Sequence, residues 1–179
     1  MPYFTSLAPH DTVREVFKLS PELANPLLDY TEVLLRGSSP LSVAERELIA
    51  AYVSGINSCR FCHTVHTATA EACGIDQGIV KESLVDLNHP GLSEKMRPIL
   101  SYARKLTEAP SSITDADAVA VFNAGWNEQA LHHVIHVCAL FNFMNRLVEG
   151  HGIEPLSPAL SEQRGRQLSD QGYAQIKTP

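Results

Sequence analysis

The sequence of 179 residues has no run of 18 apolar residues, so a membrane-spanning helix is not expected. Its first residues lack a basic region followed by an apolar stretch, which is the pattern of a secretory signal. Basic residues are scarce, because 14 Lys and Arg stand against 20 Asp and Glu, and the net charge is −6. This balance argues against nucleic acid and against an anionic membrane surface as partners. We therefore expect a cytoplasmic protein.

Strand-like alternation of apolar and polar residues is also missing beyond a few residues at a time. The chain is 44% hydrophobic and only 7% aromatic, with abundant Ala and Leu, which is typical of packed helices. The length suffices for one domain with a core. We predict a single all-α domain over residues 1–179, with a core at about 20–155, an arm at 1–19 and a tail at 156–179. The tail mixes Gly and Pro with polar residues, so it is expected to be weakly structured or to dock on another subunit.

Capping signals and apolar periodicity predict where the helices lie. Ser20-Pro21 is a cap followed by proline at the first helical position, and Ser42 with Glu45 forms a capping-box pattern. The longest periodic segment, 127–148, is apolar on most sides and is therefore expected to be the central helix. Further helices are expected at 59–72, 76–87, from 93 through 106, and from 114 to near Gly125.

Cysteine is scarce as well, and two of the four cysteines form the pair Cys59-x-x-Cys62. His66 follows Cys62 by four residues, and Glu47 precedes Cys59 by twelve. At a helix start, free N–H groups and the helix dipole stabilise a thiolate, and the usual thiol pKa of about 8.5 falls to roughly 3.5–7.5. On an ideal helix, His66 lies about 40° from Cys62 and about 20° from Cys59. One helical face thus carries a nucleophile, a partner thiol and a base, which is the layout of a thiol redox site.

Other interpretations of this stretch stay open. Cys59 and Cys62 could be buried core residues, since free cysteine is often buried. With His63 they also match the attachment motif of c-type haem, which requires an export compartment. In a cytoplasmic protein, a Cys-x-x-Cys pair is more often a redox or metal site than a structural disulfide.

Zinc is a third alternative for the same stretch. Four ligands from one helix cannot surround a tetrahedral ion, so a zinc site would also need His132 or His136. These two histidines have the i, i+4 spacing of metal ligands, but on an apolar helix such residues more often lie in the core or at an interface. Cys73 and Cys138 are expected to be structural.

The spacing of Glu47, eleven residues, Cys59-Arg-Phe-Cys62, three residues and His66 resembles a known superfamily. It is that of the AhpD-like alkylhydroperoxidases and carboxymuconolactone decarboxylases, and within it the branch of uncharacterised peroxidase-related enzymes. The motif is specific because it fixes four chemical groups at two independent spacings. The resemblance covers roughly residues 20–155 and extends to Ser54-Gly-Ile-Asn57, Ala124-Gly-Trp126 and Phe141-Asn-Phe-Met-Asn-Arg146.

The resemblance implies an all-α bundle of paired antiparallel helices and a Cys-dependent peroxidase. It makes Cys62 the nucleophile, Cys59 the resolving thiol, and His66 with Glu47 the proton relay. The implied substrate is hydrogen peroxide or an organic hydroperoxide, an external dithiol is the reductant, and no cofactor or metal is expected. Two alternatives are decarboxylase chemistry of the carboxymuconolactone type, which does not need two thiols, and a non-catalytic metal-binding or interaction domain.

One position departs from the pattern of the founding enzymes. They carry a second His between the two cysteines, where this chain has Phe61. The relay is therefore simpler here, or His63 replaces the missing side chain.

Apolar residues in both terminal segments predict a homo-oligomer. Burying each large apolar side chain is worth roughly 1.5–3 kcal/mol, so a second subunit is a natural partner for them. The superfamily resemblance implies dimers, trimers or hexamers. The residues expected at this interface are Tyr3, Phe4, Leu7, Leu160, Leu168, Tyr173 and Ile176.

Overall fold

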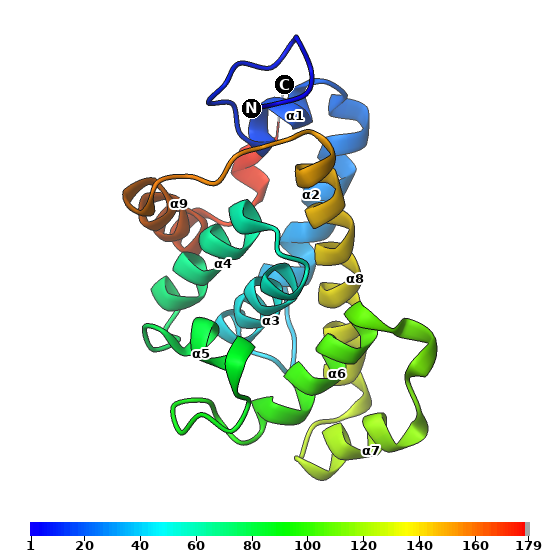
Figure 1. The fold of residues 1–179 in the computed structure, drawn as a ribbon. Coiled ribbons are helices and arrows are strands. Elements are labelled where there is room, and N and C mark those ends of the chain that lie inside the picture. Colours follow the sequence, from blue (N-terminus) through cyan, green and yellow to red (C-terminus); the bar gives the residue numbers. More distant parts are fainter. Residues whose placement is uncertain (178–179) are drawn as a thin grey trace.

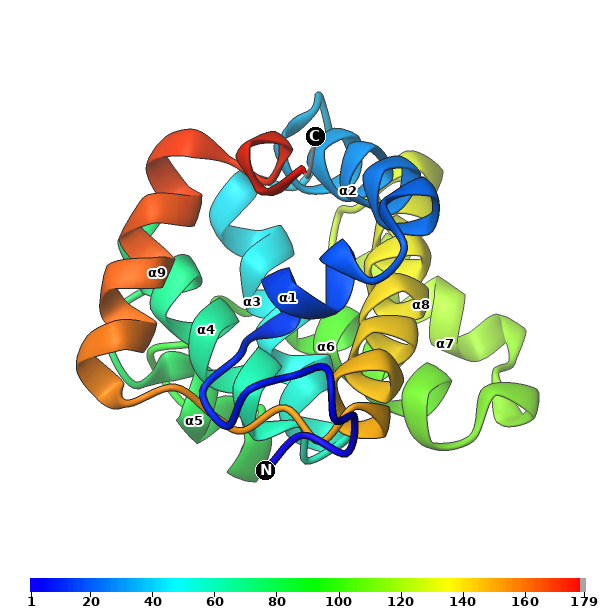
Figure 2. The same ribbon diagram turned by 90° about the horizontal axis from the view of Figure 1, so that it is seen from above.

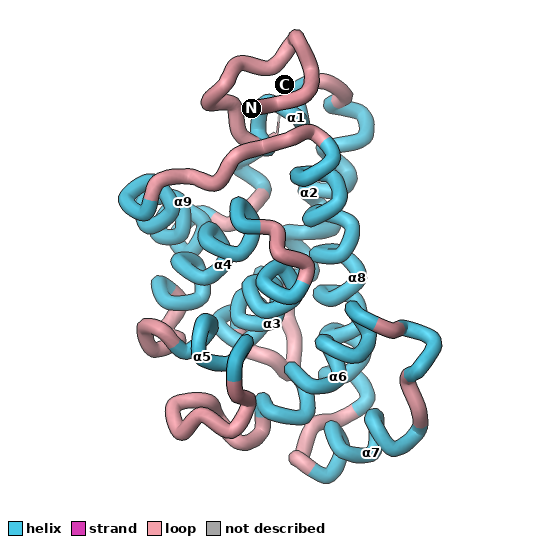
Figure 3. Tube along the Cα trace, viewed as in Figure 1, coloured by secondary structure: helices cyan, strands magenta, loops and turns pink. Residues whose placement is uncertain are grey.

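The computed structural model describes residues 1–177 and contains only helices, turns and loops over this range (Figures 1 and 3). This confirms the all-α prediction. The α-helices are α1 (Val13–Lys18), α2 (Pro21–Arg36), α3 (Val43–Ile56), α4 (Arg60–Ala72), α5 (Ile79–Val85), α6 (Met96–Glu108), α7 (Asp115–Asn123), α8 (Glu128–Gly150) and α9 (Pro158–Gln171). Two short 3-10 turns, η1 (Pro110–Ser112) and η2 (Ala174–Ile176), complete the described elements. None of the helices within 1–177 is both long and apolar enough to cross a membrane.

The central helix is α3, and not α8 as the sequence predicted. All residues from 46 to 54 are buried, because α3 packs against α2, α4, α5, α6 and α8 (Figures 1 and 2). The longer α8 keeps Ile135 and Phe143 exposed, so it covers one side of the bundle. The apolar residues of α8 therefore form one buried side of the helix, and they do not show that other helices surround it.

A capping box begins α3, as predicted. The Ser42 hydroxyl oxygen accepts from the Glu45 N–H at 3.1 Å, and the Ser42 N–H donates to the Glu45 carboxylate at 2.7 Å. Two of the first N–H groups of the helix are satisfied in this way. Arg46 satisfies carbonyl groups at the C-terminal end of α2. Its guanidinium donates to the carbonyls of Leu34 and Gly37 at 2.7 and 2.9 Å.

The link between α3 and α4 is a tight turn that fixes the position of the first cysteine. The Cys59 N–H donates to the Ser54 carbonyl and the Ser58 N–H donates to the Gly55 carbonyl, each at 3.0 Å, which is the pattern of a Schellman motif. Ser58 occupies the left-handed position of this motif with φ 58°. Cys59 is consequently the N-cap of α4. The motif turns the chain back, so that α4 packs along α3.

The segment after residue 155 is not a weakly structured tail. Residues 158–171 form α9, which packs along α4 (Figures 1 and 2). A Cβ atom on Gly165 would lie 2.5 Å from the backbone carbon of Ala68, so only glycine allows the two helices to approach this closely. The tail therefore folds back on its own subunit; positions 178 and 179 of the predicted tail lie outside the described residues.

Candidate active site

The structure places the four predicted site residues on two adjacent elements. Glu47 lies in the middle of α3 and is fully buried. Cys59 caps α4, while Cys62 and His66 lie on its first turns, all three buried. The α3–α4 packing thus brings Glu47 to the face of α4 that carries the histidine, although 19 residues separate them in sequence.

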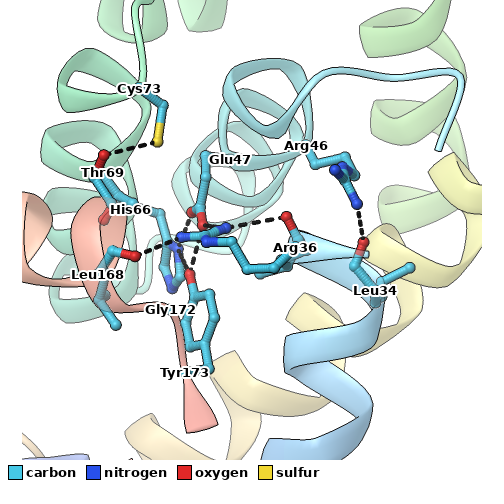
Figure 4. A network of polar contacts seen from close by, with 12 residues as sticks. Leu34, Arg36, Arg46, Glu47, His66, Thr69, Cys73, Leu168, Gly172 and Tyr173 are labelled. Atoms are coloured by element: carbon cyan, nitrogen blue, oxygen red, sulfur yellow. Dashed lines mark hydrogen bonds and ion pairs between the residues drawn. The ribbon is translucent and has the colours of Figure 1, made fainter. Parts of the chain in front are cut away.

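His66 is held in one orientation by its contact with Glu47. Its Nδ1 lies 2.8 Å from Glu47 Oε2 (Figure 4). A carboxylate only accepts hydrogen bonds, so Nδ1 carries the proton and Nε2 of the neutral ring has a free lone pair. The ring makes an edge-on contact with Phe141, at 4.5 Å between centroids, and stacks on Tyr173 at 6.2 Å. The free Nε2 of His66 thus belongs to a ring of fixed orientation, one helical turn beyond Cys62 on α4.

The second carboxylate oxygen of Glu47 binds two residues that the sequence analysis did not assign to the site. Arg36 Nη1 donates to Oε1 at 2.7 Å, and the Tyr173 hydroxyl donates to the same atom at 2.7 Å (Figure 4). Burial raises the pKa of Glu47, but the hydrogen bond from His66 Nδ1, the positive charge of Arg36 and the hydrogen bond from Tyr173 outweigh it, so the pKa is lowered overall. Glu47 is therefore a buried carboxylate with all of its charge compensated.

Tyr173 comes from the C-terminal segment, 126 residues beyond Glu47. Burial, followed by the negative charge of Glu47, raises the pKa of Tyr173 well above its usual value, so the phenol stays protonated and acts as a donor. The Arg36 guanidinium lies over its ring at 4.9 Å, and Glu32 on α2 accepts from the Tyr173 and Ala174 N–H groups. Residues of α2 and of the C-terminal turn therefore hold the Glu47 carboxylate of α3 in place beside the His66 imidazole of α4.

The two cysteines of the pair lie in different environments. Hydrogen bonding to the Cys62 sulfur, and then burial, raise the pKa of the Cys59 thiol, and Glu149 on α8 acts in the same direction. Cys59 consequently remains a thiol at neutral pH. All four cysteines are free.

A cavity of about 350 Å³ opens against Cys62 and His66. Its walls come from α1, α2, α4, α8, α9 and the C-terminal turn, and they are mostly apolar. Cys62 lines the cavity and Cys59 does not. This volume is within the range of small-molecule sites, so a ligand in the cavity would reach one sulfur of the pair and the base beside it.

His63 is placed away from the relay. Its Nδ1 lies 2.9 Å from the Ala51 carbonyl oxygen, and the residue does not line the cavity. Phe61 does line the cavity as part of its apolar wall. The structure therefore contradicts the idea that His63 replaces the missing second histidine. Arg36 and Tyr173 complete the polar network around Glu47 instead.

The Ser54-Gly-Ile-Asn57 segment supports the site from behind. The Asn145 side chain donates to Ser54 Oγ at 3.0 Å, and the Asn57 side chain donates to Asn145 Oδ1 at 2.9 Å and to Asn142 Oδ1 at 3.1 Å. These bonds tie the end of α3 to α8. They fix the Schellman turn from which Cys59 begins α4.

The geometry of residues 1–177 does not support the zinc alternative. Among them, no group of three or more His, Cys, Asp or Glu side chains is placed to hold a metal ion. His132 and His136 contact each other at 4.3 Å between ring centroids, and His136 bonds to the Tyr30 hydroxyl.

Comparisons with known proteins agree with the resemblance noted in the sequence. Residues 21–105, which include all four predicted site residues, match the Carboxymuconolactone decarboxylase family. The fold is similar to that of an uncharacterized peroxidase-related protein from Silicibacter sp. TM1040, with a TM-score of 0.77, 27% identity, and coverage of 86% of this chain and 80% of that one.

A second solved structure shares the fold. It is described as an alkylhydroperoxidase AhpD core, an uncharacterized peroxidase-related protein from Ralstonia eutropha JMP134. The TM-score is 0.76 at 21% identity, and the match covers 84% of this chain and 78% of that one. No curated protein matches the chain.

Proposed function

We propose that this chain, which belongs to the superfamily of AhpD-like alkylhydroperoxidases and carboxymuconolactone decarboxylases, is a cysteine-dependent peroxidase. The observation that carries the proposal is the single cavity wall shared by Cys62 and His66, with His66 bound through Nδ1 to the buried Glu47 carboxylate. The peroxidase-related names of proteins with this fold support an oxidoreductase over a decarboxylase. So does the second thiol, for which decarboxylation has no use.

The first chemical step consumes the peroxide at Cys62. His66 Nε2 takes the thiol proton, and the resulting thiolate attacks one oxygen of the hydroperoxide. An S–O bond forms as the O–O bond breaks, and the leaving alkoxide receives the proton from His66. The products are an alcohol, or water from hydrogen peroxide, and a sulfenic acid on Cys62. Glu47 stabilises the imidazolium that exists between the two proton transfers.

The second step uses Cys59 as the resolving thiol. Its sulfur attacks the Cys62 sulfenic sulfur, the S–S bond forms, and water leaves with the thiol proton. Because the pKa of Cys59 is raised, it does not compete with Cys62 for the peroxide in the first step. An external dithiol then restores both thiols by exchange and leaves as a disulfide. Each cycle therefore consumes one hydroperoxide and one dithiol.

Hydroperoxide consumption in the presence of a dithiol tests this proposal directly. Wild type should consume peroxide with several dithiol donors, and Cys62→Ser should lose turnover. Without added dithiol, Cys59→Ser should stop at the sulfenic acid after one peroxide. Cys73→Ser is the matched control, since Cys73 lies at the other end of α4, and it should keep the wild-type rate.

Peptide mapping after one equivalent of hydroperoxide supplies the independent readout. We expect a disulfide between Cys59 and Cys62, with Cys73 and Cys138 still reduced. Turnover that survives in Cys62→Ser, or oxidation mainly at Cys73 or Cys138, would contradict the proposed cycle.

A further inference from the structure

The cavity beside Cys62 carries positive charge with no negative charge to match it. Two arginines line it, Arg14 from α1 and Arg164 from α9. Among the described residues, no Asp, Glu or Lys lines the cavity. The rest of the wall is apolar or neutral, apart from the histidines His10 and His66.

Neither arginine has an acidic partner within residues 1–177. Arg14 Nε is buried and has no hydrogen-bond acceptor there. Arg164 Nη1 donates to the neutral amide oxygen of Gln167 at 2.8 Å. Arg36 and Arg166 differ from them, because Arg36 binds Glu47 and Arg166, also on α9, binds Glu162. The cavity thus contains two guanidinium groups whose charge no neighbouring carboxylate neutralises through an ion pair among the described residues.

The two guanidinium groups also act on each other. Burial, followed by the positive charge of Arg14, lowers the pKa of Arg164 to about 10. Glu15 lies near enough to oppose this effect, but its carboxylate already accepts from the Thr12 N–H at 3.0 Å and from Lys18 at 3.1 Å. Two like charges held together in a partly buried place are costly unless an anion compensates them. An arginine pair suits a planar, bidentate anion best.

We propose that the cavity binds hydroperoxides that carry a carboxylate on an apolar body. Arg14 and Arg164 bind the carboxylate, the apolar side chains of α1, α8 and α9 enclose the body, and the hydroperoxide group reaches Cys62. This inference rests on the proposed peroxidase function for its reactive group. The anion site itself is defined by the arginines alone.

A matched pair of substrates isolates the carboxylate. Cumene hydroperoxide and its para-carboxylate derivative share one aromatic body and one hydroperoxide group. The measured quantity is the ratio of kcat/KM for the carboxylate to that for the neutral compound. Charge-assisted hydrogen bonds to two arginines should raise this ratio to about tenfold or more in wild type. In Arg14→Gln and Arg164→Gln the ratio should fall towards one.

Arg166→Gln is the matched control, because Arg166 lies on α9 two residues from Arg164 and is exposed to solvent. It should keep the wild-type ratio. Arg164→Lys retains the charge and should restore part of the preference. Thermal unfolding followed by circular dichroism identifies any variant that does not fold. If one glutamine variant does not fold, the ratio is measured in the other. A wild-type ratio near one, or a ratio unchanged in both glutamine variants, would overturn the anion site.

Calorimetric titration with an unreactive ligand separates the two proposals. Cys62→Ser protein should bind 4-isopropylbenzoate, and it should bind 4-isopropylbenzamide at least about tenfold more weakly. Suppose that binding of 4-isopropylbenzoate depends on Arg14 and Arg164 but wild type consumes no hydroperoxide. The anion site would then stand, and only the peroxidase proposal would be overturned. If wild type turns over hydroperoxides but Cys62→Ser binds the benzoate no more tightly than the benzamide, the peroxidase proposal would stand and the anion site would be overturned.

Discussion

Residues 21–105 and the terminal segments contribute different things to one cavity. The first region matches the sequence family and contains Glu47, Cys59, Cys62 and His66, which are the groups able to carry out thiol chemistry. The segments outside it, α1, α8, α9 and the C-terminal turn, form most of the wall that a substrate would touch. The groups able to carry out thiol chemistry and most of the cavity wall therefore lie in separate stretches of sequence, and they meet only in the folded chain.

The two sets of residues depend on different parts of the fold. A fixed Glu–Cys–Cys–His arrangement on α3 and α4 needs only the pairing of two helices. The wall of the cavity can change with the terminal segments while that pairing stays intact. Tyr173 is where the two regions meet, since a residue of the C-terminal turn donates to the central carboxylate.

After the loss of Cys62 itself, the largest expected loss of turnover comes from the family-matching region, at His66. His66→Ala removes the base that takes the Cys62 proton, and we expect a fall of about 100-fold or more in peroxide turnover. Alkylation of Cys62 by iodoacetamide at neutral pH should slow as well, measured by mass spectrometry of the modified peptide. His63→Ala is the control, because His63 is on the same helix but bonds to the Ala51 carbonyl and not to the relay. Equal alkylation rates in wild type and His66→Ala would show that His66 is not the base.

Glu47→Gln should have the next largest effect, and it should reduce stability as well as turnover. The amide has no charge to balance the Arg36 guanidinium, and its single oxygen can accept either from Arg36 and Tyr173 or from His66, so one side faces an NH2 group. Removing one partner of a buried pair costs about 3 kcal/mol or more, measurable by urea unfolding. Glu45→Gln is the matched control on α3, since glutamine also completes a capping box. Similar unfolding midpoints for the two variants would refute the structural role assigned to Glu47.

The same carboxylate predicts a dependence of stability on pH. The pKa of Glu47 is lower in the folded state than the value of about 4.3 expected in the unfolded chain. Its contribution is therefore present above about pH 4.3 and is lost as the pH falls towards the folded pKa. Wild type should lose more unfolding free energy than Glu47→Gln as the pH falls below about 4.3, measured by urea unfolding at a series of pH values.

The sequence could predict that Glu47, Cys62 and His66 lie together, because these residues are near one another along two helices. The Cys-x-x-Cys spacing, the Ser42 capping box and the apolar face of α3 are local patterns, and they suffice to pair α3 with α4. Tyr173 could not be placed in this way, because no local pattern links it to Glu47 across 126 residues. It had been assigned to a subunit interface as one apolar residue of a tail.

Gly165 shows why α9 was missed. Glycine among polar residues indicates a loop or a weakly structured tail, and that was the prediction. In the structure the missing Cβ lets α9 approach the α4 backbone at Ala68. The same residue type signals opposite things, depending on a partner helix that lies about a hundred residues away in the sequence. Arg36 was missed for a similar reason, since arginine near a helix end is expected to interact only with the helix dipole.

Tyr173→Phe tests the contribution of the terminal region to the relay, with a smaller expected effect. The ring stays beneath Arg36 and beside His66, and only the hydroxyl that donates to Glu47 is lost. One hydrogen bond to a charged group is worth about 1.5–3 kcal/mol, so unfolding free energy should fall by roughly that amount and turnover by a few-fold. Tyr102→Phe on α6 is the control and should change neither. A wild-type pH profile of Cys62 alkylation in Tyr173→Phe would remove the residue from the relay.

The smallest effect on the chemistry is expected from changes at the surface that we propose for self-association. Four of the seven terminal residues expected at an interface, Leu7, Leu168, Tyr173 and Ile176, are buried within the same subunit. The homo-oligomer stays a prediction, but an apolar surface over α2 and α8 is the better candidate. Leu23 and Val33 on α2 are 72% and 70% exposed, and Phe143 on α8 is 53% exposed. The Tyr30–His136 contact, which is itself exposed, joins the two helices.

Light scattering across the micromolar range measures this association. Large exposed apolar side chains clustered on neighbouring helices mark association sites, and closed symmetry is the usual outcome. We expect wild type to be an oligomer, and Val33→Glu and Phe143→Glu to shift it towards the monomer with little change in turnover per subunit. Val85→Glu on α5 places the same charge on a residue that is 84% exposed elsewhere, and it should leave the mass unchanged. A monomeric wild type would rule out the oligomer. An oligomer that resists both substitutions would move the interface away from α2 and α8, back towards the exposed terminal residues Tyr3, Phe4 and Leu160.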